Sequence, residues 1–99
     1  MQNADAAHSL EFRIFETEEF KKALIRVGPP RFLRKKLDSY IYPQLRQSPY
    51  FGPNIKKLQG YTHATWRYRI GPYRVFYSLD EAKKLVFVLT IDDRKDAYR

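Results

Sequence analysis

Residues 65–77 read TWRYRIGPYRVFY, and this stretch decides the fold. The segments 65–70 and 73–79 alternate between apolar or aromatic and polar residues, a period of two that is typical of half-buried strands. Between them lies Gly71-Pro72, which forms a tight turn and pairs Ile70 with Tyr73. The stretch therefore predicts an antiparallel β-hairpin in a fixed register.

This register gives the hairpin two chemically different faces, because opposed residues share a face. One face is aromatic and apolar: Trp66, Tyr68, Ile70, Tyr73, Val75 and Tyr77. The other face carries Arg67, Arg69 and Arg74. We expect the aromatic face to lie under helices and the three arginines to converge on the opposite side of the sheet.

A further strand is predicted at residues 85–91, whose nearly continuous apolar character is typical of a central strand. A five-residue connection, 80–84, joins it to the hairpin. Continuing the register places Thr90 opposite Arg74 and adds apolar residues to the arginine face: Phe76, Val86 and Val88. The chain would then leave the sheet beside the arginines, carrying Arg94, Lys95 and Tyr98.

The N-terminal half predicts one strand and two helices. Residues 10–14 alternate as a strand does, and Thr17 is a capping residue for a helix that Gly28-Pro29-Pro30 ends. Apolar residues recur every four from Leu33 to Leu45 and predict an amphipathic helix, which Pro43 bends or restarts. The element order β-α-α-β-β-β favours an α+β fold: a small antiparallel sheet with two helices packed on one face.

Composition limits the class of protein. The chain has 99 residues, a net charge of +8 and no cysteine, so we expect one domain over 1–99, with 1–9 as a flexible or loosely attached N-terminus. Disulfides and thiolate zinc sites are excluded, and two histidines do not make a histidine-rich metal site. No apolar run is long enough for a transmembrane span, so a cytoplasmic protein is expected. The positive charge favours a polyanionic partner, either nucleic acid or an acidic protein.

The arginine face is suited to phosphate. Arg69 opposite Arg74 places like charges together at a cost of about 0.2–1 kcal/mol, which a bound anion would relieve. Guanidinium groups bind phosphate bidentately but stay protonated, so proton transfer needs other groups. The candidates are Tyr98, Asp92, Asp93 and His63. Two simpler interpretations remain open: the arginines only solvate an exposed face, and the aspartates only pair with Arg94 or Lys95.

Segments 55–61 (IKKLQGY), 66–77 (WRYRIGPYRVFY), 86–91 (VFVLTI) and 94–98 (RKDAY) resemble the RelE/ParE superfamily of toxins from prokaryotic toxin–antitoxin modules. The resemblance covers about residues 10–99 in element order. The superfamily fold is a small antiparallel sheet with two helices packed on one face, which agrees with the arrangement predicted from the residue pattern.

For the RelE-type branch, the resemblance implies an endoribonuclease that needs no metal or other cofactor. Such an enzyme cleaves messenger RNA, usually in the ribosomal A site, through attack of the substrate 2′-hydroxyl on the adjacent phosphate. The positions that correspond to the family's catalytic set are Arg67, Arg69, Arg74, Arg94 and Tyr98. We expect RNA binding by Lys56, Lys57 and Lys95, and acid or base roles for Asp93 or His63.

The sequence departs from the RelE pattern in places. Arg67 and Arg69 stand where lysine is more frequent, which keeps phosphate binding but removes a possible lysine acid or base. Asp92 and Asp93 stand where glycine with histidine or lysine is usual, and Asn54 stands in the loop where some members carry a catalytic glutamate.

Two alternatives from other functional classes share the same basic face. The ParE-type branch inhibits DNA gyrase by binding and has no nuclease activity, and a non-catalytic RNA-binding module is a third interpretation. In either toxin branch the resemblance implies a cognate antitoxin that wraps the toxin with a helix and a strand, and an acidic antitoxin would suit a chain of charge +8.

Overall fold

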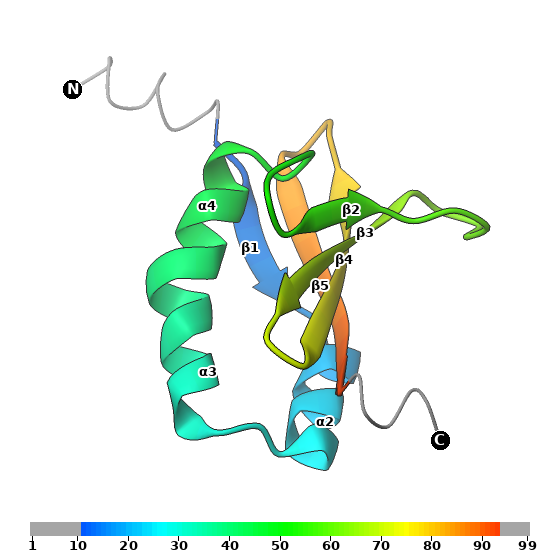
Figure 1. The fold of residues 1–99 in the computed structure, drawn as a ribbon. Coiled ribbons are helices and arrows are strands. Elements are labelled where there is room, and N and C mark those ends of the chain that lie inside the picture. Colours follow the sequence, from blue (N-terminus) through cyan, green and yellow to red (C-terminus); the bar gives the residue numbers. More distant parts are fainter. Residues whose placement is uncertain (1–10, 94–99) are drawn as a thin grey trace.

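A computed structural model describes residues 11–93, and these residues form a sheet with helices on one side (Figure 1). The five strands are β1 Arg13–Glu16, β2 Ile55–Lys57, β3 Thr65–Ile70, β4 Tyr73–Asp80 and β5 Leu85–Asp93. The helical segments are α2 Glu18–Val27, α3 Arg31–Lys36, η1 Leu37–Ile41 and α4 Tyr42–Gln47. The α+β class is confirmed, whereas the predictions for residues 1–9, Arg94, Lys95 and Tyr98 lie outside the described residues.

The sheet order is β1-β5-β4-β3-β2, and the sheet is mixed rather than purely antiparallel. β1 runs parallel to β5, with Arg13 beside Leu85 and Glu16 beside Val88, while the other neighbours are antiparallel. Alternation along 10–14 predicts a strand but not its direction, because side chains alternate in the same way in both kinds of pairing. The direction is set where the chain leaves β1, since the Thr17 hydroxyl donates to the Val88 carbonyl at 2.8 Å.

β2 is a strand that the predicted element order β-α-α-β-β-β does not contain. Its three residues pair with β3, placing Ile55 opposite Tyr68 and Lys56 opposite Arg67. A three-residue strand that contains two exposed lysines is too short for alternation to reveal it.

The predicted register of the β3–β4 hairpin is confirmed at every pair. Ile70 lies opposite Tyr73 and Arg69 lies opposite Arg74. Gly71 has a φ of 57°, the left-handed conformation that a two-residue hairpin turn requires and that glycine adopts without strain.

The predicted register of the β4–β5 pair is wrong. Asp80 pairs with Leu85, so the connection is one residue shorter than expected, and Lys84 takes a φ of 55° to close it. A bulge follows, because Tyr77 pairs with Val88 and Phe76 with Thr90. A bulge adds one residue to one strand. The shorter connection and the bulge each shift the pairing of β5 by one residue, and a shift of one residue moves the side chains that follow it to the opposite face of the sheet.

Two expectations change as a result. Arg74 lies opposite Asp92 rather than Thr90. Val86 and Val88 do not share the arginine face, since both side chains are fully buried in the core on the helix side. Phe76 does lie on the arginine side, directly opposite Arg67.

The first helix begins and ends as predicted. The Thr17 hydroxyl oxygen accepts a hydrogen bond from the Phe20 amide at 3.1 Å, and Gly28 closes the helix in the left-handed conformation with a φ of 60°. The negative charge of Glu18 in the first turn interacts favourably with the positive end of the helix dipole. This helix buries Phe20 and Ala23 against the sheet.

The second helical segment runs from α3 through η1 to α4 without a break (Figure 1). η1 is a wide π turn, closed by a hydrogen bond from the Tyr42 amide to the Leu37 carbonyl. Pro43 follows directly, and its ring would clash with the Ser39 carbonyl in a regular α-helix. A π turn moves that carbonyl outward, so the chain absorbs the proline by widening locally instead of restarting.

The core lies between the helices and the aromatic face of the hairpin, as predicted. Tyr68 and Tyr77 are buried, and their hydroxyls donate to Gln44 Oε1 at 2.9 Å and to the Pro49 carbonyl at 2.7 Å. Burial raises the pKa of both phenols, because it penalises the phenolate. Among residues 11–93, the helices are too short and too polar to span a membrane.

Candidate nucleic-acid interface

The side of the sheet turned away from the helices is the open face. By strand alternation it carries Lys56, Thr65, Arg67, Arg69, Arg74, Phe76, Phe87, Thr90 and Asp92. Most of these side chains are exposed or half-buried, in contrast to the buried side chains of the helix side. The open face therefore presents charged and polar side chains, which the core excludes.

Four cations lie on three adjacent strands of the open face. Arg69 and Arg74 are cross-strand partners between β3 and β4, and Lys56 and Arg67 are partners between β2 and β3. Neighbouring strands lie about 4.8 Å apart, so these side chains form one group rather than scattered charges. The prediction that Arg67, Arg69 and Arg74 lie on one face of the sheet is confirmed by the register.

Arg74 already has an anionic partner. Its Nε and Nη2 atoms donate to the two carboxylate oxygens of Asp92 at 3.0 and 3.1 Å. The pair is only partly exposed, with 26% of the Arg74 side chain and 41% of the Asp92 side chain accessible. The Arg74 guanidinium also lies 5.9 Å from the centre of the Phe76 ring. Asp92 therefore offsets part of the repulsion between Arg74 and Arg69, which the sequence alone led us to expect of a bound anion.

The other predicted acid and base candidates lie elsewhere. Asp93 is the cross-strand partner of Tyr73, whose side chain packs against the core, so Asp93 belongs to the helix side. His63 is exposed and lies in a bend before the start of β3, whereas Arg69 lies near the opposite end of that strand. Neither is brought together with the arginines, and the aspartate on the arginine side is Asp92.

The two predicted RNA-binding lysines of β2 also separate. Lys56 faces Arg67 on the open face. Lys57 lies opposite Trp66, and its Nζ is 5.4 Å from the centre of the Trp66 ring, on the helix side. Only Lys56 of this pair therefore extends the cationic group.

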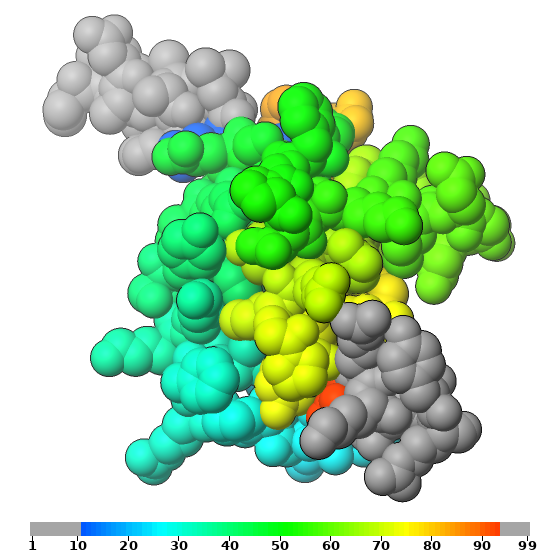
Figure 2. Space-filling model, viewed as in Figure 1, coloured from blue at the N-terminus to red at the C-terminus, as the bar shows by residue number. Residues whose placement is uncertain are grey.

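A cavity of about 260 Å³ opens on the same face, next to the Arg74–Asp92 pair. Its lining comes from β3, β4, β5 and the segment between β2 and β3: Tyr61, Thr65, Phe76, Leu89, Thr90 and Asp92. In Figure 2 that segment, coloured green, stands out from the body of the molecule. This cavity has no signal in the local sequence, because it depends on the register of β5 and on the placement of Tyr61.

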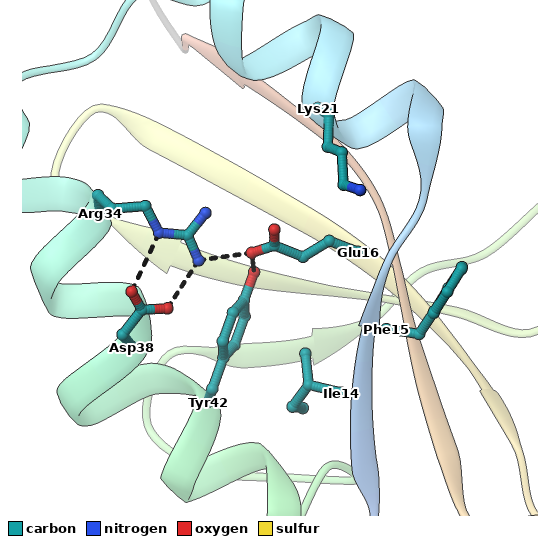
Figure 3. A pocket seen from close by; sticks show the side chains of 7 residues that line it. All are labelled: Ile14, Phe15, Glu16, Lys21, Arg34, Asp38 and Tyr42. Carbon is teal, nitrogen blue, oxygen red and sulfur yellow. Dashed lines mark hydrogen bonds and ion pairs between the residues drawn. The ribbon is translucent and has the colours of Figure 1, made fainter.

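A second polar cluster lies on the helix side (Figure 3). The Glu16 carboxylate accepts from Arg34 Nη2 at 2.5 Å and from the Tyr42 hydroxyl at 2.6 Å, and Asp38 also pairs with Arg34. These bonds raise the pKa of Arg34, and burial together with Glu16 raises the pKa of Tyr42. The groups satisfy one another and tie β1 to the second helical segment, so we interpret the cluster as structural.

The family model described as "ParE toxin of type II toxin-antitoxin system, parDE" matches residues 14–98. The chain belongs to this toxin family. The resemblance to the RelE/ParE superfamily is thereby confirmed, and the protein is a toxin of the type II toxin–antitoxin class. No curated protein sequence matches the chain significantly.

Solved structures of RelE toxins have a similar fold. The RelBE2 toxin–antitoxin complex from Mycobacterium tuberculosis is matched at 25% identity over 85% of this chain and 99% of that chain, with a TM-score of 0.68. The RelB–RelE complex from Methanococcus jannaschii is matched at 23% identity over 85% and 94% of the two chains, with a TM-score of 0.64. The isolated RelE toxin of E. coli is matched at 20% identity over 83% of each chain, also with a TM-score of 0.64.

Proposed function

We propose that this toxin is a metal-independent endoribonuclease that cleaves messenger RNA and thereby inhibits translation. The observation that carries the proposal is the cross-strand placement of Arg69 and Arg74, with Arg67 beside them on the open face. Two like charges directly opposite each other destabilise the fold. A phosphate of RNA bound between the two arginines would replace this repulsion with charge-assisted hydrogen bonds.

In the proposed reaction the substrate's own 2′-hydroxyl attacks the adjacent phosphorus atom. The P–O5′ bond then breaks, which leaves a 2′,3′-cyclic phosphate and a free 5′-hydroxyl. The arginines bind the non-bridging oxygens and stabilise the charge that develops on the phosphorane. Asp92 holds Arg74 through two hydrogen bonds and fixes the direction of its guanidinium plane.

Proton transfer needs a group other than arginine, because a guanidinium stays protonated. We propose that Tyr98 takes part in moving the proton of the attacking 2′-hydroxyl to the leaving 5′-oxygen, and that Arg94 adds a further donor to the phosphate, as the resemblance to RelE-type toxins implies. A tyrosine among several cations loses its proton more readily, since positive charge favours the phenolate.

The proposal includes two partners and a place of action. A cognate antitoxin would keep the toxin silent, and the similarity to chains of RelB–RelE complexes supports it. The ribosomal A site would present the messenger RNA. An acidic antitoxin and messenger RNA on the ribosome would both be attracted to a basic toxin of net charge +8 acting in the cytoplasm.

Inhibition of DNA gyrase without cleavage is the second candidate. Two observations favour it: the matching family model is that of the ParE toxin, and Arg74 is engaged by Asp92 before any substrate arrives. A toxin that acts by binding alone has no need of a free phosphate-binding arginine.

Two assays with the same purified protein separate the candidates. Messenger RNA is incubated with the toxin, with and without ribosomes, and the products are tested for 2′,3′-cyclic phosphate ends. Gyrase supercoiling is measured in parallel. Cleavage with these ends and unchanged gyrase activity is the expected result. Gyrase inhibition by a protein that leaves both RNA samples intact would overturn the nuclease proposal.

A further inference from the structure

We propose that the cavity lined by Tyr61, Phe76 and Asp92 on the open face is a nucleobase subsite for single-stranded RNA, and that it prefers cytosine to uracil. The inference rests on the proposed function in that it gives the same open face an RNA ligand. It concerns recognition of a base, whereas the arginines concern the phosphate.

The cavity has the walls that a flat aromatic ligand requires. Tyr61 is 56% exposed although it is a large aromatic residue, and it lines the cavity from the segment between β2 and β3. Phe76 lines it from β4, and Leu89 adds an apolar surface from β5. Single-stranded nucleic acids bind through aromatic side chains on which bases stack. A cavity of about 260 Å³ has the size expected for one small ring system, not for a segment of another protein.

The cavity is connected directly to the phosphate-binding cations. Arg74 lies over the Phe76 ring at 5.9 Å and pairs with Asp92, so one arginine touches two walls of the cavity. Arg67 is the cross-strand partner of Phe76. A strand whose phosphate lies on Arg69 and Arg74 therefore has a neighbouring base within reach of the cavity.

The strand bulge produces this arrangement. Because the pairing shifts between Phe76 and Tyr77, β5 contains one extra residue at Leu89. The shift places Thr90 and Asp92 on the open face, where both line the cavity. Bulges recur beside binding and active sites, where they redirect side chains, and this bulge supplies the polar wall.

That polar wall discriminates between pyrimidines. An ionised carboxylate only accepts hydrogen bonds, and each oxygen of Asp92 keeps a lone pair after accepting from Arg74. Cytosine presents an amino group at the 4-position, where uracil presents a carbonyl oxygen. The amino group donates to Asp92, whereas the 4-oxygen of uracil is a second acceptor facing the carboxylate. The imino N3–H of uracil can donate, but it lies between two carbonyl oxygens that repel the carboxylate, so cytosine is favoured.

Affinity is measured by fluorescence anisotropy with short 2′-O-methyl oligonucleotides, which lack the nucleophilic hydroxyl and are not cleaved. The two oligonucleotides differ by cytosine or uracil at the central position, within otherwise abasic flanks. We expect wild-type protein to bind the cytosine form at least about 5-fold more tightly, the value of one well-placed hydrogen bond. Asp92→Asn should bring the ratio close to one. The ratio is the readout because this change also releases Arg74 and alters the affinity for both oligonucleotides.

Tyr61→Ala should weaken binding of both oligonucleotides by about 5- to 150-fold, the range for loss of one stacked base. The matched control is Tyr40→Ala, because Tyr40 is equally exposed at 55% but lies in η1 on the helix side. Equal affinity of wild-type protein for the two oligonucleotides, or equal effects of the two tyrosine changes, would overturn the subsite. Absence of RNA cleavage would overturn only the nuclease proposal, since these ligands report binding alone.

Discussion

The two faces of the β3–β4 hairpin are made of alternate residues of the same two strands, yet they differ in almost every property. On the helix side, Tyr68 and Tyr77 are buried and their hydroxyls are bonded within the chain. On the open face, Arg69 and Arg74 stand opposite each other, and an excess of positive charge remains after Asp92 is counted.

The difference separates the residues that stabilise the fold from those that contribute nothing to its stability. The helix side removes apolar surface from water and satisfies its own polar atoms, so it accounts for stability. The open face gains nothing for folding from opposed cations. Substitutions on the two faces should therefore separate into losses of stability and losses of activity.

Leu37→Ala on the helix side should give the largest loss of stability. Leu37 is fully buried in the π turn, and truncation should lower the free energy of unfolding by about 2–5 kcal/mol through lost burial and a new cavity. Urea unfolding measures the change, and Lys35→Ala, at an exposed position on α3, is the control with a shift within about 0.5 kcal/mol. Activity per folded molecule should stay unchanged. An inactive but fully stable Leu37→Ala variant would contradict the separation of the faces.

Arg74→Ala on the open face should show the opposite pattern. Loss of one donor to the developing phosphorane should slow RNA cleavage by about 100- to 1000-fold, with little change in urea unfolding. Arg13→Ala is the matched control, because Arg13 is an exposed arginine of β1 at the other edge of the same sheet. Wild-type cleavage by Arg74→Ala would remove the arginine group from the mechanism.

The parts of the fold that were predictable are those with a strong local signal. Gly71-Pro72 leaves one register for the β3–β4 hairpin, and that register placed Arg69 opposite Arg74. Thr17 and Gly28 fixed the ends of α2 because capping residues act within a few positions of themselves.

The parts that were missed depend on backbone geometry without such a signal. Lys84 closes the β4–β5 turn at a positive φ where glycine or asparagine would have marked the turn. The bulge at Leu89 lies inside an apolar run that looks the same with or without it. The Arg74–Asp92 pair and the cavity follow from these two features. The hairpin register therefore placed the arginines and Phe76, whereas the position of Asp92 beside Arg74 could not be predicted.

Tyr77→Phe tests the helix side through pH. Burial raises the pKa of Tyr77 above the value of about 10 for an unfolded tyrosine. Above pH 10 the unfolded chain therefore binds fewer protons than the folded chain, and stability falls as the pH rises, by up to about 1.4 kcal/mol per pH unit for this group. Urea unfolding at pH 8–11 should show a shallower alkaline loss for Tyr77→Phe. At pH 8 the variant should be less stable by about 0.5–1.5 kcal/mol, because the bond to Pro49 is gone. Parallel alkaline slopes for the two proteins would contradict the assignment to Tyr77.

Arg69→Gln should give the smallest effect and is the most specific test of the open face. Removing one of two opposed cations should raise the free energy of unfolding by about 0.2–1 kcal/mol. The gain should be larger in an Asp92→Asn background, because Arg74 then lacks the carboxylate that offsets its charge. A double-mutant cycle by urea unfolding isolates the difference. In 1 M NaCl, where the Debye length is about 3 Å, the background dependence should shrink, as it must for a charge effect. Equal increases in the free energy of unfolding in both backgrounds at low salt would mean that Asp92 does not offset the charge of Arg74. The repulsion between Arg69 and Arg74 would then be relieved only when RNA binds.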